Sequence, residues 1–231
     1  MYRLYWMQGE GVNNFGDVLT PKLFDYFSIR YVHDNTNFNT ISIGSIGNKA
    51  NDKCIVLGSG TAWENIKLNP NAEWVFVRGP LTRESVIKSG GKCPEIFGDP
   101  ALLLPIFCDE SNKEFDLGII PHYKEYEMVK KMYPNEKVIN LNNPNPLEVA
   151  KEITKCRMTI SSSLHGIICS HAYNIPCAWV KFSDKIIGDD TKFKDHYKSI
   201  DLDCKLSSFN DPIFTNKYVN TNKLVDIFKS L

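Results

Sequence analysis

The sequence predicts an α/β protein with two parallel sheets, each covered by helices. Short runs rich in β-branched and aromatic residues alternate with stretches in which apolar residues have helical spacing, a pattern typical of parallel strands joined by helices. The polar segment 108–114 interrupts this alternation, and the pattern then begins again. The chain of 231 residues is long enough for two units of roughly 100–120 residues each. We therefore expect one α/β domain over 1–112 and a second over 113–231.

The first domain is predicted to hold five strands and two helices. Strands are expected at 2–7, 40–45, 53–60, 73–79 and 93–99. Residues 17–28 have apolar side chains at the spacing of one helix face. Residues 80–91 begin with a proline and end in two glycines, which mark the start and the end of a second helix.

The second domain repeats this pattern. Strands are expected at 115–123, 136–141, 157–163 and 177–182, and helices at 124–133, 146–156, 164–173 and near 221–231. The order again predicts a parallel sheet with helices packed on its faces.

Composition excludes several classes of protein. The 27 basic and 27 acidic side chains cancel, so no overall field draws the chain to nucleic acid, and local groups must hold any anionic ligand. The seven cysteines are scattered without a Cys-x-x-Cys pair, which favours free buried thiols over a disulfide framework or a zinc site. The sequence has no apolar run as long as a membrane span, which needs about 18 residues, and no apolar signal peptide at its start. We expect a cytoplasmic protein without a metal site.

Ligands of parallel α/β sheets bind at the carboxyl ends of the strands, and polar loops occur there. The first such loop, "NNFGD", offers Asn14 and Asp17 to sugar hydroxyls, although Asp17 would also serve as a helix N-cap. The second, "LGSGTA", has the small residues Gly58, Ser59 and Gly60, which would let backbone amides approach an anion. Close packing explains these glycines equally well.

A third loop, "VRGPLTRE", carries two arginines. Arg78 closes a strand and Arg83 lies one turn into the following helix. An arginine at the end of a strand suits a bidentate clamp on phosphate or carboxylate. The alternative is that Arg78 forms a structural ion pair.

The fourth loop lies within "TISSSLHGIICSHAY". Ser162 or Ser163 is expected to cap the next helix, so that its first amides point outward as an anion site. Bound negative charge would favour the imidazolium form of His165 and make it a proton donor, and Gly166 would leave room for the ligand. A core histidine is the plainer interpretation. His122, in "IIPHY", also follows a strand, and this convergence of polar residues at strand ends favours a functional site.

In this order, "NFGD", "RGPLTRE", "GDPALLLP", "PHY" and "SSSLHGIICSHAYNIP" resemble the polysaccharide pyruvyl transferase family over residues 10–200. The resemblance implies two Rossmann-like domains facing a cleft, as in GT-B glycosyltransferases. It implies transfer of a pyruvyl group from phosphoenolpyruvate to a sugar, usually as a cyclic ketal. The family's catalytic histidine corresponds to His165, its strand-end arginine to Arg78 and the histidine of its "PHY" loop to His122. Many members carry an arginine where this chain has Ser163, so the second phosphate clamp is missing or comes from Arg83, Lys181 or a lysine in 192–194.

These expectations together give a reaction. His165 is the acid that protonates phosphoenolpyruvate, Arg78 and His122 hold phosphate or carboxylate, and Asp17 acts near the acceptor. Phosphoenolpyruvate is the donor substrate, and no cofactor is expected. The acceptor would be a sugar of a capsule or exopolysaccharide, or of its lipid-linked precursor. A lipid-linked acceptor would bring the protein to the inner face of the membrane as a peripheral protein.

Two other functions fit the same loops. A GT-B glycosyltransferase would use a nucleotide sugar, although the second half of the chain has no clear acidic residue for the ribose. A non-catalytic module would bind sugars or anions without turnover.

Overall fold

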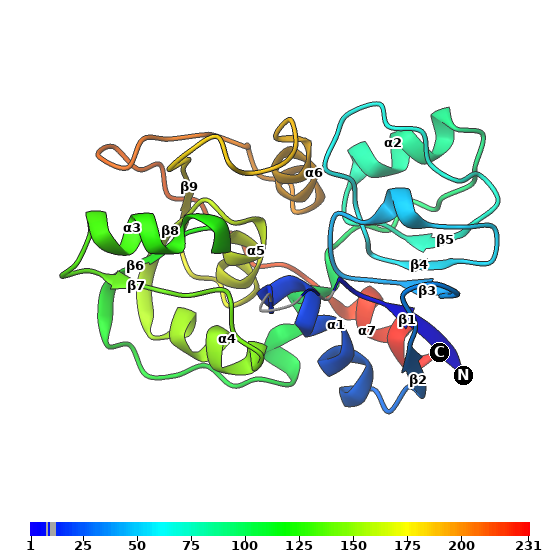
Figure 1. Ribbon diagram of the computed structural model, residues 1–231, viewed down its shortest axis with the longest axis horizontal. Coiled ribbons are helices and arrows are strands. Elements are labelled where there is room, and N and C mark those ends of the chain that lie inside the picture. The colour runs from blue at the N-terminus through cyan, green and yellow to red at the C-terminus, as the bar shows by residue number, and fades with distance from the viewer. Residues whose placement is uncertain (8, 10–12) are drawn as a thin grey trace.

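The computed structural model describes residues 1–7, 9 and 13–231, and it contains two separate parallel sheets (Figure 1). The first sheet has the strand order β2-β1-β3-β4-β5. Its strands are β1 (Tyr2–Tyr5), β2 (Tyr31–His33), β3 (Thr40–Ile41), β4 (Ile55–Leu57) and β5 (Glu73–Phe76). The helices of this part of the chain are α1 (Phe15–Tyr26) and α2 (Pro80–Lys88), with 3₁₀ helices η1 (Gly47–Lys49) and η2 (Pro100–Ile106).

The second sheet has the strand order β7-β6-β8-β9. Its strands are β6 (Phe115–Ile120), β7 (Lys137–Val138), β8 (Cys156–Ser161) and β9 (Cys177–Trp179). The helices are η3 (Tyr123–Glu125), α3 (Tyr126–Met132), α4 (Pro146–Thr154), α5 (Leu164–Ala172), α6 (Thr191–Ser199) and α7 (Asn222–Lys229). All strand pairs in both sheets are parallel, so the predicted α/β class with parallel sheets is confirmed. The GT-B arrangement stays a prediction.

Among the strands and α-helices, three elements differ from the sequence prediction. The expected strand at 93–99 forms only an isolated bridge between Val77 and Phe97, because Pro94 has no amide to donate and Gly98 turns the chain at a φ of 145°. The short edge strand β2 was not predicted. Helix α6 was not predicted either, because its buried residues include Asp195 and His196 beside Phe193 and Tyr197, and this mixture obscures the apolar spacing of a helix.

One apolar core joins the two sheets. It includes Leu4 and Phe76 of the first sheet, Ile120 and Cys177 of the second, and residues of α1, α4, α5 and η2 between them. Helix α7 comes last in the chain but packs against the first sheet, where Phe228 meets Phe24, Phe27 and Phe76. Figure 1 shows α7 beside β1, with the two chain ends close together. The division at residue 112 stays a prediction.

The cysteines are free thiols, as expected, and all but Cys204 are buried. Among the helices of the described residues, none has both the length and the apolar character needed to cross a membrane.

Candidate active site between the two sheets

A cavity of about 210 Å³ lies where loops from both sheets meet. Asn14 and Ser45 reach it from loops that follow β1 and β3, and Asp17 reaches it from the first turn of α1. His122, Ser163, His165 and Lys192 reach it from segments that follow β6, β8 and β9. The cavity thus lies at the carboxyl ends of parallel strands, where such sheets bind ligands.

His165 is in the first turn of α5 and is almost wholly buried. Its imidazole lies against Gly16 at the start of α1, so closely that a Cβ on Gly16 would overlap Nδ1 and Cε1 of the ring. Helix α1 can approach α5 in this way only because residue 16 is a glycine. Gly16 of "NFGD" and His165 of "LHG" are therefore in contact, although the two segments are far apart in the sequence.

Asp99 faces the imidazole of His165 and was not predicted as a site residue. Its Oδ2 lies 3.7 Å from Nε2 of His165, and its side chain is fully buried. The other oxygen accepts a hydrogen bond from the amide of Ala101 and caps η2. The sequence held one signal for this residue: a carboxylate within the buried apolar segment "IFGDPALLLP" needs a partner there.

Asp17 faces the cavity from α1. Asn14 donates a hydrogen bond to its Oδ2 at 2.7 Å. Burial raises the pKa of Asp17, while that hydrogen bond and the field of His165 act in the opposite direction. Tyr123 lines the same cavity, and burial together with the charge of Asp17 raises the pKa of its phenol. Asp17 is therefore a carboxyl group able to take up a proton inside the cavity.

His122 and Lys192 also line the cavity, the first from the loop after β6 and the second from α6. Burial lowers the pKa of His122 to about 4, and the charges of Lys192, Lys124 and His165 contribute, so the ring is neutral at pH 7. Its Nδ1 accepts the amide of Lys124, which leaves the Nε2 proton available for donation. Burial lowers the pKa of Lys192 to about 8, with Arg78 and Lys124 adding to the shift and Asp190 opposing it.

Arg78 does not line the cavity. Its guanidinium is fully buried and makes three bonds, from Nε to Asp195 at 3.2 Å, from Nη1 to Ser45 at 2.8 Å and from Nη2 to the carbonyl of Thr61 at 2.6 Å. These contacts are those of a structural ion pair. Direct contact with phosphate would require Arg78 to leave Asp195, so its role as a clamp stays a prediction. Ser45 lines the cavity, and Arg78 thereby supports its wall.

The structure does not bring the other predicted residues to the cavity. Gly58, Ser59 and Gly60 pack around Arg78, Gly44 and Pro100, and a Cβ on Gly60 would overlap the guanidinium. Arg83 pairs with Glu95 and donates to the carbonyl of Cys93.

Two residues of the "SSSLHG" segment also serve packing. Ser162 is buried between the amide of His122 and the carboxylate of Glu125. Gly166 faces Ser161 and Ile120, so it brings α5 close to the sheet and does not make room for a ligand. Ser163 is the N-cap position of α5 and lines the cavity.

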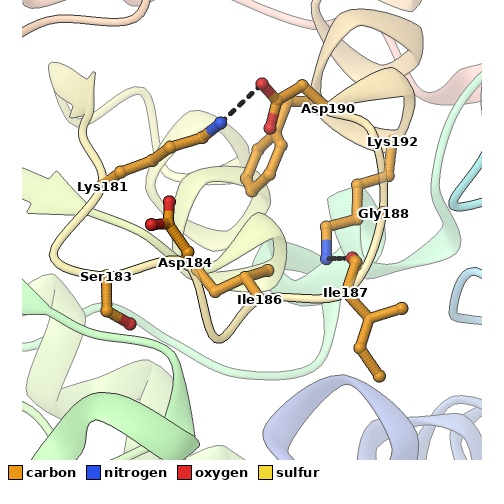
Figure 2. Close-up of a pocket in the computed structure, with 9 residues that line it drawn as sticks. Lys181, Ser183, Asp184, Ile186, Ile187, Gly188, Asp190 and Lys192 are labelled. Atoms are coloured by element: carbon orange, nitrogen blue, oxygen red, sulfur yellow. Dashed lines mark hydrogen bonds and ion pairs between the residues drawn. The ribbon is translucent and has the colours of Figure 1, made fainter.

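A second cavity of about 210 Å³ adjoins the first and shares Ile187 and Lys192 with it. Figure 2 shows Lys181 paired with Asp190 and the ammonium group of Lys192 donating to the carbonyl of Ile187. Among the described residues, no three His, Cys, Asp or Glu side chains are grouped to hold a metal ion.

Comparisons with known proteins agree with the motifs. The family model described as polysaccharide pyruvyl transferase matches residues 7–184. Uncharacterized protein L143 of Acanthamoeba polyphaga mimivirus is 31% identical over 202 residues, which are 81% of this chain and 69% of that protein. Succinoglycan biosynthesis protein ExoV of Rhizobium meliloti (strain 1021) is 29% identical over 201 residues, which are 79% of this chain and 60% of that protein. No solved structure matches.

The family match extends over both sheets and includes the residues that line the cavity from Asn14 to His165. It confirms the resemblance predicted from the five motifs. The chain therefore belongs to the polysaccharide pyruvyl transferase family and, at the level of that family, is a transferase of polysaccharide biosynthesis.

Proposed function

We propose that the cavity between the sheets transfers a pyruvyl group from phosphoenolpyruvate to two hydroxyls of a sugar, forming a cyclic ketal and releasing phosphate. The observation that carries this proposal is His165, a nearly buried imidazole at the start of α5, facing a small cavity that also holds Lys192 and His122. A cavity of about 210 Å³ suits a compact anion better than a nucleotide sugar.

The donor would bind through three kinds of groups. Lys192 supplies a positive charge, the neutral ring of His122 donates one hydrogen bond, and the first amides of α5 complete the anion site. Lys192 takes the role of the second phosphate clamp, which Ser163 cannot supply, because it lines the cavity and the other candidates do not: Arg83 pairs with Glu95, Lys181 pairs with Asp190 and Lys194 is exposed.

The reaction balances with the side chains present. His165 donates a proton to the methylene carbon of phosphoenolpyruvate, which becomes the methyl group and leaves an oxocarbenium-like centre at C2. One sugar hydroxyl adds to C2, the C2–O bond to phosphate breaks, and the second hydroxyl closes the ring. Two hydroxyl protons are released: one restores the imidazolium of His165 and the other leaves with phosphate by way of Asp17.

The proposed reaction also implies an arrangement of the two domains and a cellular location. The two sheets would act as Rossmann-like domains in a GT-B arrangement, with the catalytic cleft where both meet. Seven free cysteines favour the reducing cytoplasm. A lipid-linked acceptor would be met at the inner membrane face.

The first experiment is thermal unfolding with phosphoenolpyruvate, UDP, GDP and NAD in parallel. A ligand at 100 times its dissociation constant adds about 2.7 kcal/mol of stability, and each kcal/mol raises Tm by roughly 2–4 °C at this size. Phosphoenolpyruvate alone should raise Tm. A rise with UDP or GDP instead would favour a glycosyltransferase. Saturation without phosphate release, across a panel of sugar acceptors, would favour a non-catalytic module.

Lys192 provides the matched variants for this test. Because the pKa of Lys192 is about 8, the affinity for phosphoenolpyruvate should fall as the pH rises through 8 and the ammonium loses its charge. Lys192→Met should weaken binding at least tenfold and remove this dependence. Lys194→Met, an exposed change on the same helix, should leave both unchanged. Equal binding by the two variants would contradict the role of Lys192.

A further inference from the structure

Asp99 and His165 form a buried pair whose facing atoms have no other partner. Oδ2 of Asp99 and Nε2 of His165 are both shielded from solvent, and neither has a hydrogen bond in the structure. The two atoms are 3.7 Å apart, within reach of an ion pair but long for a hydrogen bond. An unpaired buried carboxylate oxygen is costly, so this arrangement calls for an explanation beyond the capping of η2.

The burial of Nε2 decides which ring nitrogen can meet a substrate. Nε2 faces Asp99 and is shielded from solvent, whereas the Nδ1 edge of the ring lies against Gly16, which is followed in the chain by the cavity-lining Asp17. A substrate in the cavity can therefore reach His165 only through the Nδ1 side of the ring. For Nδ1 to give or take a proton, Nε2 has to keep its own.

We propose that Asp99 is a positioning residue that keeps the Nε2 proton on His165 and leaves Nδ1 as the nitrogen that transfers the proton. A shift of under about 1 Å would bring the 3.7 Å separation into hydrogen-bond range, as commonly happens when a substrate binds. The carboxylate of Asp99 would then favour the imidazolium that precedes proton donation, as the aspartate of a catalytic triad does for its histidine. The role of Asp99 rests on the proposed function of His165.

The titratable groups around His165 bear on any pH profile. Asp99 faces it from η2, Asp17 from α1, His122 from the loop after β6 and His196 from α6. Of these, only Asp99 is in ion-pair contact with the ring.

Two substitutions test the role while preserving the cap. In Asp99→Asn the amide oxygen still accepts from Ala101, so the amide nitrogen faces Nε2 and stabilises the opposite tautomer. Asp99→Ser keeps a capping oxygen but removes the charge. Both variants should lose about 10²–10⁴-fold in kcat. The descending limb of the kcat–pH profile should also move to lower pH in both variants, because the negative charge that favours the protonated acid has been removed.

The tautomer of His165 can be measured directly, without any assay of activity. In ¹⁵N-histidine spectra, with His165 assigned by its loss in His165→Gln, the neutral ring should carry its proton on Nε2 in the wild type and on Nδ1 in Asp99→Asn. Asn145→Ala, which removes the N-cap of α4 away from the site, is the control for loss of a cap alone and should change neither the tautomer nor the profile. An Nδ1 proton in the wild type, or wild-type kcat and pH profile in both Asp99 variants, would overturn the inference. If the wild type fails to turn over phosphoenolpyruvate, the proposed reaction fails and the spectra still decide the role of Asp99.

Discussion

Gly16 shows how a single residue links the two halves of the site. It lies at the start of α1, while the ring that it contacts belongs to α5 beside the other sheet. The next residue in the chain, Asp17, lines the cavity. The "NFGD" segment thus does two things at once: Gly16 makes room for the imidazole and Asp17 brings a carboxyl group to the ligand.

We predict that Gly16→Ala impairs activity more than stability. The added methyl overlaps the imidazole of His165, which has to rotate away, and kcat should fall at least about 10²-fold because general acid catalysis is lost. Alanine is favoured over glycine in a helix by up to about 1 kcal/mol, which offsets part of the cost of displacing the ring, so Tm should fall less than in a variant whose added methyl has no movable neighbour.

Gly166→Ala gives the opposite result. Its methyl meets Ser161 and Ile120 between α5 and the sheet, so Tm should fall. Steady-state kinetics and thermal unfolding of the two variants together make the test. Full activity in Gly16→Ala would show that the position of the ring is not critical.

Sequence reasoning identified the residues of the cavity that lie between a predicted strand and the first turn of the next helix. Asp17, His122, Ser163 and His165 belong to this group, because the carboxyl ends of parallel strands meet at one edge. Asp99 was missed because its partner is distant in the chain. Lys192 was only one of several candidates, since nothing in a local pattern shows which lysine reaches the cavity.

The position of helix α6 is held by the buried carboxylate of Asp195. Asp195 accepts hydrogen bonds from the amides of Leu81 and Thr82 at the start of α2, from the hydroxyl of Thr82 and from Arg78. These bonds fasten α6, and with it Lys192, to the part of the chain that follows the first sheet. Sequence patterns missed α6 because the polar side chains of Asp195 and His196 are buried on it together with apolar ones, which obscures the helical spacing.

We predict that Asp195→Asn lowers the free energy of unfolding by about 3–5 kcal/mol, because it leaves the buried guanidinium of Arg78 without its counter-charge. Urea unfolding measures this loss. Asp201→Asn removes an exposed carboxylate from an ion pair with Lys217 and should cost little. A similarly small cost for Asp195→Asn would mean that Arg78 has another partner and is freer to reach a ligand.

The two sheets are joined by one apolar core that the sequence predicted only in part. The alternation of strands and helices indicated both sheets, and the polar break separated them. The return of α7 to the first sheet could not be predicted, because an amphipathic helix does not specify which apolar surface it covers. Between α5 and α6 the same core encloses two histidines, with Nδ1 of His171 3.0 Å from Nε2 of His196.

This histidine pair makes the stability of the fold depend on pH. Burial lowers the pKa of His171 to about 4, and burial with the neighbouring His171 holds the pKa of His196 well below its usual value. In the unfolded chain both rings titrate near about 6.5, so between that pH and about 4 the unfolded state binds more protons than the folded state. The free energy of unfolding should therefore be highest above pH 6.5 and should fall with decreasing pH, by up to about 1.4 kcal/mol per pH unit for each ring. His122 contributes in the same direction.

Replacing one ring of the pair, in His171→Gln, should make the dependence of the free energy of unfolding on pH shallower, whereas His33→Gln on the exposed edge strand should leave it unchanged. Urea unfolding at pH 5, 6, 7 and 8 measures the slopes, and equal slopes in His171→Gln and the wild type would contradict a neutral buried pair.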